Sequence, residues 1–208
     1  METLSLDEIL AIIRDTGSVI QILNEDINIL MKHLRLNENM EFWLRTVVRN
    51  FFADSEARCF QFRRLCLALH SVGEVAFSAE EVVALRDERI SISGGRVLTS
   101  AAKTKTHEGF LFAHKMLARA IGVEDPIDTS REEEWSLYLR ALKIRDRLTH
   151  PKELKDLQIT DDESQMLIRV LNWVGTKERT ILDRTVELAK NQNFINRINA
   201  RFSSSDSK

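Results

Sequence analysis

The sequence is poor in the residues that interrupt helices and in those that cross-link small domains. Its 208 residues include 2 prolines, 7 glycines and 2 cysteines. Proline and glycine are the least favourable residues inside a helix, so their scarcity leaves long segments free to be helical. A chain of this length also buries enough apolar surface to fold without disulfides or a structural metal. These absences favour an all-α fold around an ordinary hydrophobic core.

The two cysteines, Cys59 and Cys66, suit neither a disulfide nor a zinc site. Both fall in one predicted helix, where their spacing corresponds to a rise of about 10.5 Å, which is longer than a disulfide allows. Histidines do not cluster beside them, so we expect no bound metal. We interpret both as small apolar side chains in a reducing compartment.

A strong excess of one charge and a long apolar run are missing as well. The chain has 30 Lys and Arg against 32 Asp and Glu, a formal charge of −2. A nucleic-acid-binding role would therefore depend on a local basic patch. Apolar runs stay well below the roughly 18 residues that span a bilayer, and the acidic start is unlike a secretory leader. We expect a cytoplasmic protein without membrane association.

Apolar residues recur every three or four positions along most of the chain, which predicts amphipathic helices. A short first helix, Leu6 to Arg14, is expected to stop at Gly17, and Ser18 is expected to cap a second. Asn39 opens a third helix, and a fourth, capped by Asp54 or Ser55, forms an antiparallel hairpin with it. Further helices are predicted over residues 78–88, 104–121, 129–148 and from 160 towards 198.

One segment favours strand. Arg89 to Thr99 places β-branched residues on both sides of Gly94 and Gly95, a pattern typical of a tight hairpin. The predicted fold is an all-α helix bundle with at most a small β-hairpin near residues 89–99. Residues 1–36 are expected to form N-terminal helices that pack on the bundle, residues 37–200 the main helical domain, and residues 201–208 a disordered tail.

Chemistry is most strongly indicated at Arg145, Asp146 and His150, where a predicted helix meets Pro151. The proline disfavours helical geometry at His150, which allows its imidazole and the long arginine side chain to face one cleft. Residues 140–156 carry six basic and three acidic side chains, a local positive surplus in an acidic chain. Such a surplus favours binding of phosphates.

This arrangement resembles the motif of the HEPN family of helical domains, in which four to six residues separate an arginine from a histidine and the first of them is polar. The resemblance implies an all-α bundle, usually dimeric, whose motif-bearing helices meet and cut RNA without a metal or other cofactor. It implies Arg145, His150 and Asp146 as the catalytic set and Glu56 as a supporting acid. RNA-binding residues would be Arg140, Lys143, Arg147 and Lys152. The implied setting is toxin–antitoxin or phage-defence biology, with an antitoxin or regulatory protein as a further partner.

The side chains suit phosphodiester transesterification. A neutral imidazole accepts the 2′-OH proton, its conjugate acid protonates the leaving 5′ oxygen, and a guanidinium binds the phosphorane through two hydrogen bonds. One histidine does not easily serve as base and acid at once, so a homodimer that contributes two is attractive.

A structural interpretation of the same residues stays open. His150 is then a helix C-cap, and Arg145 and Arg147 pair with acids on neighbouring helices. The chain would be a non-catalytic helical module that binds RNA or protein. Arg64 and His70 have a similar spacing inside an apolar helix, and we interpret that match as accidental. His107 and His114 are expected at the edge of the core.

Overall fold

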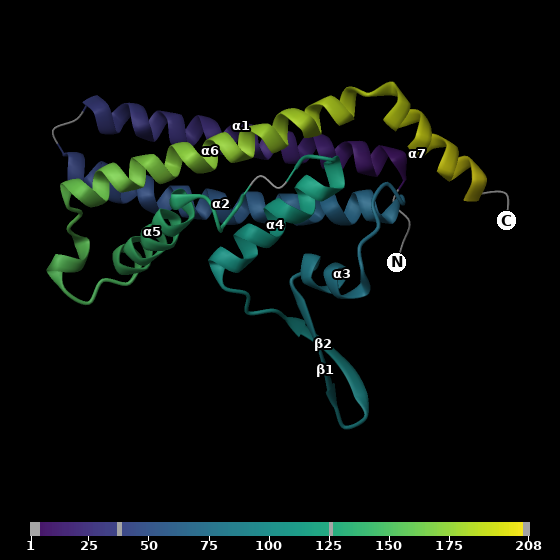
Figure 1. The fold of residues 1–208 in the computed structure, drawn as a ribbon, viewed down its shortest axis with the longest axis horizontal. Coiled ribbons are helices and arrows are strands. Elements are labelled where there is room, and N and C mark those ends of the chain that lie inside the picture. The colour runs from purple at the N-terminus through teal and green to yellow at the C-terminus, as the bar shows by residue number, and fades with distance from the viewer. Residues whose placement is uncertain (1–4, 37–38, 125–126, 206–208) are drawn as a thin grey trace. The chain divides into compact units, whose positions relative to one another are not determined.

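The computed structural model describes residues 5–36, 39–124 and 127–205. This part of the chain is mostly helical and contains one two-stranded antiparallel hairpin (Figure 1), so the predicted all-α class with a small hairpin is confirmed. The elements are α1 (Leu6–Leu36), α2 (Met40–Ser71), α3 (Ala79–Leu85), β1 (Glu88–Ser93), β2 (Arg96–Ala101), α4 (Thr106–Ile121), α5 (Glu133–Thr149), the 3-10 helix η1 (Leu154–Leu157), α6 (Asp161–Lys190) and α7 (Gln192–Ser205).

The first two helices are longer than the sequence predicts. Gly17 lies inside α1, and Asp54 and Ser55 lie inside α2, so the predicted breaks and the predicted helix hairpin around residues 39–72 are wrong. Buried Ile13 and Ile20 flank Gly17 at a spacing of two helical turns. Because that apolar stripe stays in phase, its burial outweighs the cost of one helical glycine, about 1 kcal/mol.

The C-terminal helix is divided where the sequence suggests continuity. α6 ends at Lys190, and the side-chain oxygen of Asn191 accepts hydrogen bonds from the backbone N–H groups of Asn193 and Phe194 at 2.9 and 3.2 Å. This cap starts α7, which extends to Ser205. The predicted tail is thus helical as far as Ser205, and residues 206–208 lie outside the described part of the chain.

Side-chain caps and a glycine mark other helix ends. Ser78 and Glu81 form a reciprocal capping box at the start of α3, and Thr160 and Glu163 bond in the same way before α6. Gly122 closes α4 with a φ of 71°, a left-handed conformation that glycine adopts without strain.

The chain divides into two compact units. The first combines Met1–Gly17, Cys59–Pro126 and Ile181–Lys208, and the second combines Ser18–Arg58 and Ile127–Thr180. The predicted domain boundary after residue 36 therefore falls inside the second unit. α1, α2 and α6 each supply residues to both units.

The first unit is built around Phe62, Phe110 and Leu117, which are almost wholly buried. His114 is also completely buried, deeper than the sequence suggests, with its Nδ1 2.8 Å from the carbonyl oxygen of Phe110. Its ring lies edge-on to that of Phe62, with 5.1 Å between the ring centroids. This histidine is a core residue.

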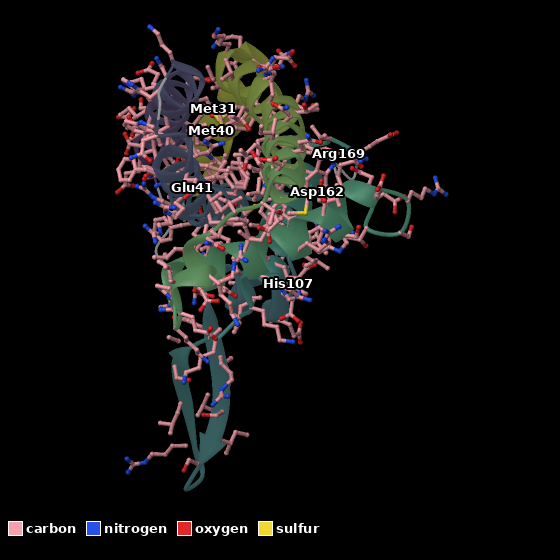
Figure 2. The ribbon with its side chains drawn as sticks, turned by 90° about the vertical axis from the view of Figure 1, so that its left-hand side faces the viewer. Met31, Met40, Glu41, His107, Asp162 and Arg169 are labelled. Carbon is pink, nitrogen blue, oxygen red and sulfur yellow. The ribbon has the colours of Figure 1, made fainter. Side chains whose placement is uncertain are left out.

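The second unit packs α5 against α2 residues around Phe52 and Tyr138, whose ring centroids lie 5.8 Å apart. A second apolar cluster, centred on Leu44 and Val47, includes partly buried residues from α1, α2 and α6. Figure 2 labels Met31, which belongs to this cluster, and Met40, the first residue of α2. This unit contains every residue of the predicted RNA-cleaving site.

Candidate functional site

The candidate site lies on α5 and the turn that follows it. Tyr138, Ala141 and Leu148 are completely buried, so this face of α5 is fixed in the core of the second unit. The helix ends before Pro151, as predicted, and the N–H of His150 donates the last helical hydrogen bond to the carbonyl of Asp146 at 3.0 Å. The motif is therefore carried by a well-anchored helix end.

Two arginines of α2 bind backbone carbonyls, one at the end of α5 and one at the end of η1. Arg49 Nη2 donates to the carbonyl oxygen of Leu148 at 2.6 Å, and Arg45 Nη1 donates to that of Leu157 at 3.2 Å. The last carbonyl groups of a helix have no hydrogen-bond partner within the helix and carry partial negative charge. A guanidinium supplies both a hydrogen-bond donor and a positive charge to such a carbonyl. Neither arginine was predicted from the sequence.

Arg145 is held between two carboxylates. Its guanidinium bonds to Glu56 on α2 and, at 2.9 Å, to Oδ1 of Asp146. The same group lies over the ring of Phe52, with 5.9 Å between its central carbon and the ring centroid. The side chain of Arg145 is 21% exposed and that of Glu56 51%, so the cluster is reachable from solvent. The structure thus brings together Arg145, Asp146 and Glu56.

His150 is exposed at the end of α5. Its imidazole makes no hydrogen bond or ion pair with the residues that the structure describes, and none joins it to Arg145. His150 is the C-cap of α5, and its φ of −126° and ψ of 58° lie outside the helical region, as the following proline favours. Arg145 is directed towards α2, whereas the imidazole remains available to solvent.

The predicted RNA-binding residues fall into two groups. Arg147 bonds to Glu163 at 3.0 Å and to the carbonyl oxygen of Gln158 at 2.9 Å. Arg140, Lys143 and Lys152 are exposed, and their charged groups have no ion pair in the described part of the chain. The spacing of Arg140 and Lys143 places them on one side of α5.

The expected pairing of Arg145 and Arg147 with acids on neighbouring helices is confirmed by the contacts with Glu56 and Glu163. At the second match to the motif, His70 Nδ1 lies 3.1 Å from the carbonyl oxygen of Val75 and accepts from the N–H of Phe77 at 3.3 Å. That imidazole serves the turn after α2, which agrees with our interpretation of the match as accidental.

The second unit contains a buried cluster of charged residues that was not predicted from the sequence. Asp54 is 9% exposed, Arg58 7% and Glu178 1%, and Arg58 forms an ion pair with Glu178. Burial raises the pKa of Asp54 to about 6, an effect that Arg58 opposes and that Asp26 and Glu178 reinforce. Asp54 and Arg58 are four residues apart within an apolar stripe, a spacing that could have indicated this buried cluster. Asp54 was instead interpreted as a helix cap.

Neither cysteine offers a reactive thiolate. Cys59 and Cys66 are buried, neither is in a disulfide, and burial raises the pKa of the Cys66 thiol above its usual range. In the ranges that the structure describes, histidine, cysteine and carboxylate side chains do not gather in groups of three or more that could hold a metal ion. None of the helices described has an apolar stretch long enough to traverse a bilayer.

Comparison with known proteins identifies no relative: no protein-family model matches the chain, and neither a curated protein nor a solved structure is significantly similar to it. The resemblance to HEPN domains therefore depends on the motif residues themselves.

Proposed function

We propose that the chain is a metal-independent endoribonuclease of the HEPN type, which cleaves RNA by attack of the 2′-OH on the adjacent phosphate. The observation that carries this proposal is the contrast between two side chains at the end of α5. Arg145 is oriented by Glu56 and Asp146, whereas His150 is exposed and has no bonding partner among the described residues.

His150 supplies proton transfer in this proposal. An imidazole ring nitrogen can accept a proton and, once protonated, donate it again. Because no described side chain holds its ring nitrogens, they are available to a 2′-OH or to a leaving 5′ oxygen. The anchored end of α5 limits the movement of the backbone that carries it.

Arg145 supplies charge stabilisation. Its planar guanidinium presents parallel donors that match two oxygens of a phosphorane, and such charge-assisted pairs are stronger than neutral hydrogen bonds. RNA phosphate would replace Glu56 on the guanidinium, since the Glu56 carboxylate is half exposed and its bond is therefore weak in free energy. Asp146, the neighbouring residue, would keep the side chain oriented during this exchange.

The basic side chains of α5 and the following turn would hold the RNA. Arg140, Lys143 and Lys152 are exposed cations without an ion-pair partner in the part of the structure described, so each can neutralise a phosphate. Arg147 would contribute less, because Glu163 already neutralises it.

A homodimer would complete the site. One imidazole does not readily act as base and acid in a single turnover, and no bond joins His150 to Arg145 in the described part of the chain. Two copies that meet through their motif-bearing helices would bring two copies each of Arg145 and His150 together. An antitoxin or regulatory protein that covers this surface, in a toxin or phage-defence setting, would keep such a nuclease silent.

The direct test is RNA cleavage by the purified chain in EDTA. We expect single-stranded RNA to be cut to products with a 2′,3′-cyclic phosphate and a 5′-hydroxyl, and we expect His150→Ala and Arg145→Ala to lower the rate at least 100-fold. His107→Ala is the matched control, because it removes another partly exposed histidine far along the sequence. Equal rates for the wild type and His150→Ala would exclude this function.

A second candidate is a non-catalytic helical module that binds RNA or protein. The pairing of Arg145 and Arg147 with carboxylates favours it, because both guanidinium groups then serve the packing of α5 against α2 and α6. This candidate predicts RNA binding without cleavage, with Lys143→Ala and Lys152→Ala each lowering the salt dependence of binding. Fluorescence anisotropy with a labelled RNA at several salt concentrations measures both effects.

A further inference from the structure

The two faces of the β1–β2 hairpin, which belongs to the first unit, differ in chemistry. Three cross-strand pairs of its antiparallel register lie on one face: Arg89 with Ser100, Ser91 with Leu98, and Ser93 with Arg96. The other three pairs lie on the opposite, aliphatic face: Glu88 with Ala101, Ile90 with Thr99, and Ile92 with Val97. All arginines and serines of the two strands therefore share one face, which contains no acid. We call it the arginine–serine face.

The hairpin and its flanks carry cations that are available to a partner. Residues 86–103 contain four basic and two acidic side chains. Asp87 is paired with Arg63 at 3.1 Å, and Glu88 lies on the aliphatic face. The four basic residues are exposed, and none forms an ion pair with the residues that the structure describes: Arg86, Arg89, Arg96 and Lys103. This surface is cationic in a chain whose formal charge is −2.

The arginine–serine face is held where a large partner can reach it. Figure 1 shows the hairpin projecting beyond α3 and α4, and Figure 2 shows its side chains extending from the ribbon without a neighbouring helix. A strand rises about 3.3 Å per residue, so Arg89 and the cross-strand pair of Ser93 and Arg96 are about 13 Å apart along the ribbon. Ser91 lies between them. Two cations thus flank short, neutral hydroxyl groups.

We propose that the arginine–serine face binds double-stranded RNA across its minor groove. The minor groove of an A-form helix is wide and shallow, and it displays ribose 2′-hydroxyl groups between two phosphate strands. Arg89 and Arg96 bind phosphates on either side of the groove, and Ser91 and Ser93 exchange hydrogen bonds with the 2′-hydroxyls. A shallow groove is contacted by one face of a ribbon, so the aliphatic face stays outside the contact.

The composition of the hairpin favours a duplex over a single strand. Sites for single-stranded nucleic acid stack bases on aromatic side chains, and residues 86–103 contain none. Contacts with phosphate and ribose need no unstacked base, so they suit a paired RNA. The choice of RNA over DNA rests on the proposed function, to which this inference adds paired segments of RNA as a class of bound substrate.

Fluorescence anisotropy with a labelled RNA duplex of about 20 base pairs tests the proposal. The full chain with His150→Ala is used throughout, so that cleavage does not disturb the measurement. We expect Arg89→Ala and Arg96→Ala each to weaken binding about three- to tenfold and to lower the slope of log affinity against log salt concentration by about one. Arg64→Ala is the matched control, because it removes another arginine of the first unit that is 42% exposed, and binding should stay within about twofold.

A second comparison tests the contact with ribose. The RNA duplex should bind at least about fivefold more tightly than a DNA duplex of the same sequence, which lacks 2′-hydroxyl groups. Joint replacement of Ser91 and Ser93 by Ala should reduce this preference to about twofold or less. Both are small changes on a ribbon that projects from the unit, and circular dichroism verifies that each variant is folded.

The outcomes separate this inference from the nuclease activity, which is measured by cleavage of single-stranded RNA. Duplex binding that needs Arg89 and Arg96 supports the inference even if the wild type cleaves nothing. Equal affinity for RNA and DNA duplexes, no duplex binding by a chain that cleaves, or binding unchanged by both arginine substitutions would overturn it. Binding to phosphatidylserine vesicles that requires Ile92, which is 78% exposed on the aliphatic face, without duplex binding would overturn it in favour of a lipid surface.

Discussion

Asp54 carries an ionisable carboxyl in the apolar part of the second unit, where burial outweighs the attraction of Arg58. Its pKa rises from 3.8 to about 6 in the folded chain. The folded state therefore binds this proton more strongly than the unfolded state does. The stabilising contribution of that proton is complete below about pH 4 and is lost as the pH rises through about 6.

Replacement of Asp54 by Asn should remove this dependence. We expect Asp54→Asn to increase the free energy of unfolding at pH 7.5 by about 1–3 kcal/mol relative to the wild type, and the difference to shrink towards zero near pH 4. Urea unfolding of the wild type and Asp54→Asn at several pH values measures this difference in the free energy of unfolding. Asp183→Asn, at an exposed position of α6, should show no comparable difference. A constant difference across the pH range would contradict the buried-acid explanation.

Glu56 competes with phosphate for Arg145 if the proposed function is correct. Glu56→Gln keeps a hydrogen-bond acceptor beside the guanidinium but removes the negative charge. We expect it to tighten RNA binding about two- to fivefold, since exposed ion pairs of this kind contribute about 0.2–1 kcal/mol. Fluorescence anisotropy with a catalytically inactive His150→Ala background measures binding without cleavage. Weaker binding would show that Glu56 supports RNA contact instead of opposing it.

Arg145, Asp146, His150 and Glu56 were predicted from the sequence as one group. In the structure, Arg145 contacts Asp146 and Glu56. The sequence pattern did not locate His150 relative to Arg145, because His150 has φ and ψ outside the helical region and helical periodicity does not determine where its side chain lies. It also missed the cluster around Asp54, since an acid beside a serine is an equally good signal for a helix cap.

At the scale of elements, the end of α5 depends on Arg49. The guanidinium binds the carbonyl of Leu148, one of the groups that a helix cannot satisfy internally. We expect Arg49→Ala to loosen the last turn and to raise hydrogen exchange of the amides near His150 by about tenfold, which corresponds to about 1.4 kcal/mol. Exchange in α4 should not change.

Arg64→Ala is the matched control for that substitution. Arg64 lies on the same helix, α2, and its ion pair with Asp15 is long, at 4.0 Å. Removal of this side chain should leave exchange at the end of α5 unaltered. Equal effects of the two substitutions would mean that Arg49 acts through the general stability of α2 and not through the α5 carbonyl.

The ends of a helix can be predicted from the sequence where a nearby side chain caps the backbone or a glycine adopts a left-handed conformation. The capping boxes at Ser78 and Thr160 and the left-handed Gly122 are cases in which few atoms decide the outcome. The continuity of α1 through Gly17 was not predictable from local rules. It depends on burial of the apolar residues on both sides, which is a property of the folded unit.

At the scale of the whole molecule, composition was sufficient for the fold class but not for its organisation. Few prolines and glycines and a strong helical period predicted an all-α chain with one hairpin. The two compact units interleave segments from distant parts of the sequence, and no composition shift marks their limits. Long helices that contribute to both units conceal such boundaries, because their apolar pattern continues without a break.

The central claim at this scale is that the exposed imidazole of His150 cleaves RNA without a metal. Single-turnover cleavage of an end-labelled RNA in EDTA, with excess wild type or His150→Ala, tests it most directly. We expect a measurable first-order rate for the wild type, a cyclic phosphate at the new 3′ end, and a rate lowered at least 100-fold in the variant. Cleavage that persists in His150→Ala, or intact RNA after prolonged incubation with the wild type, would contradict it.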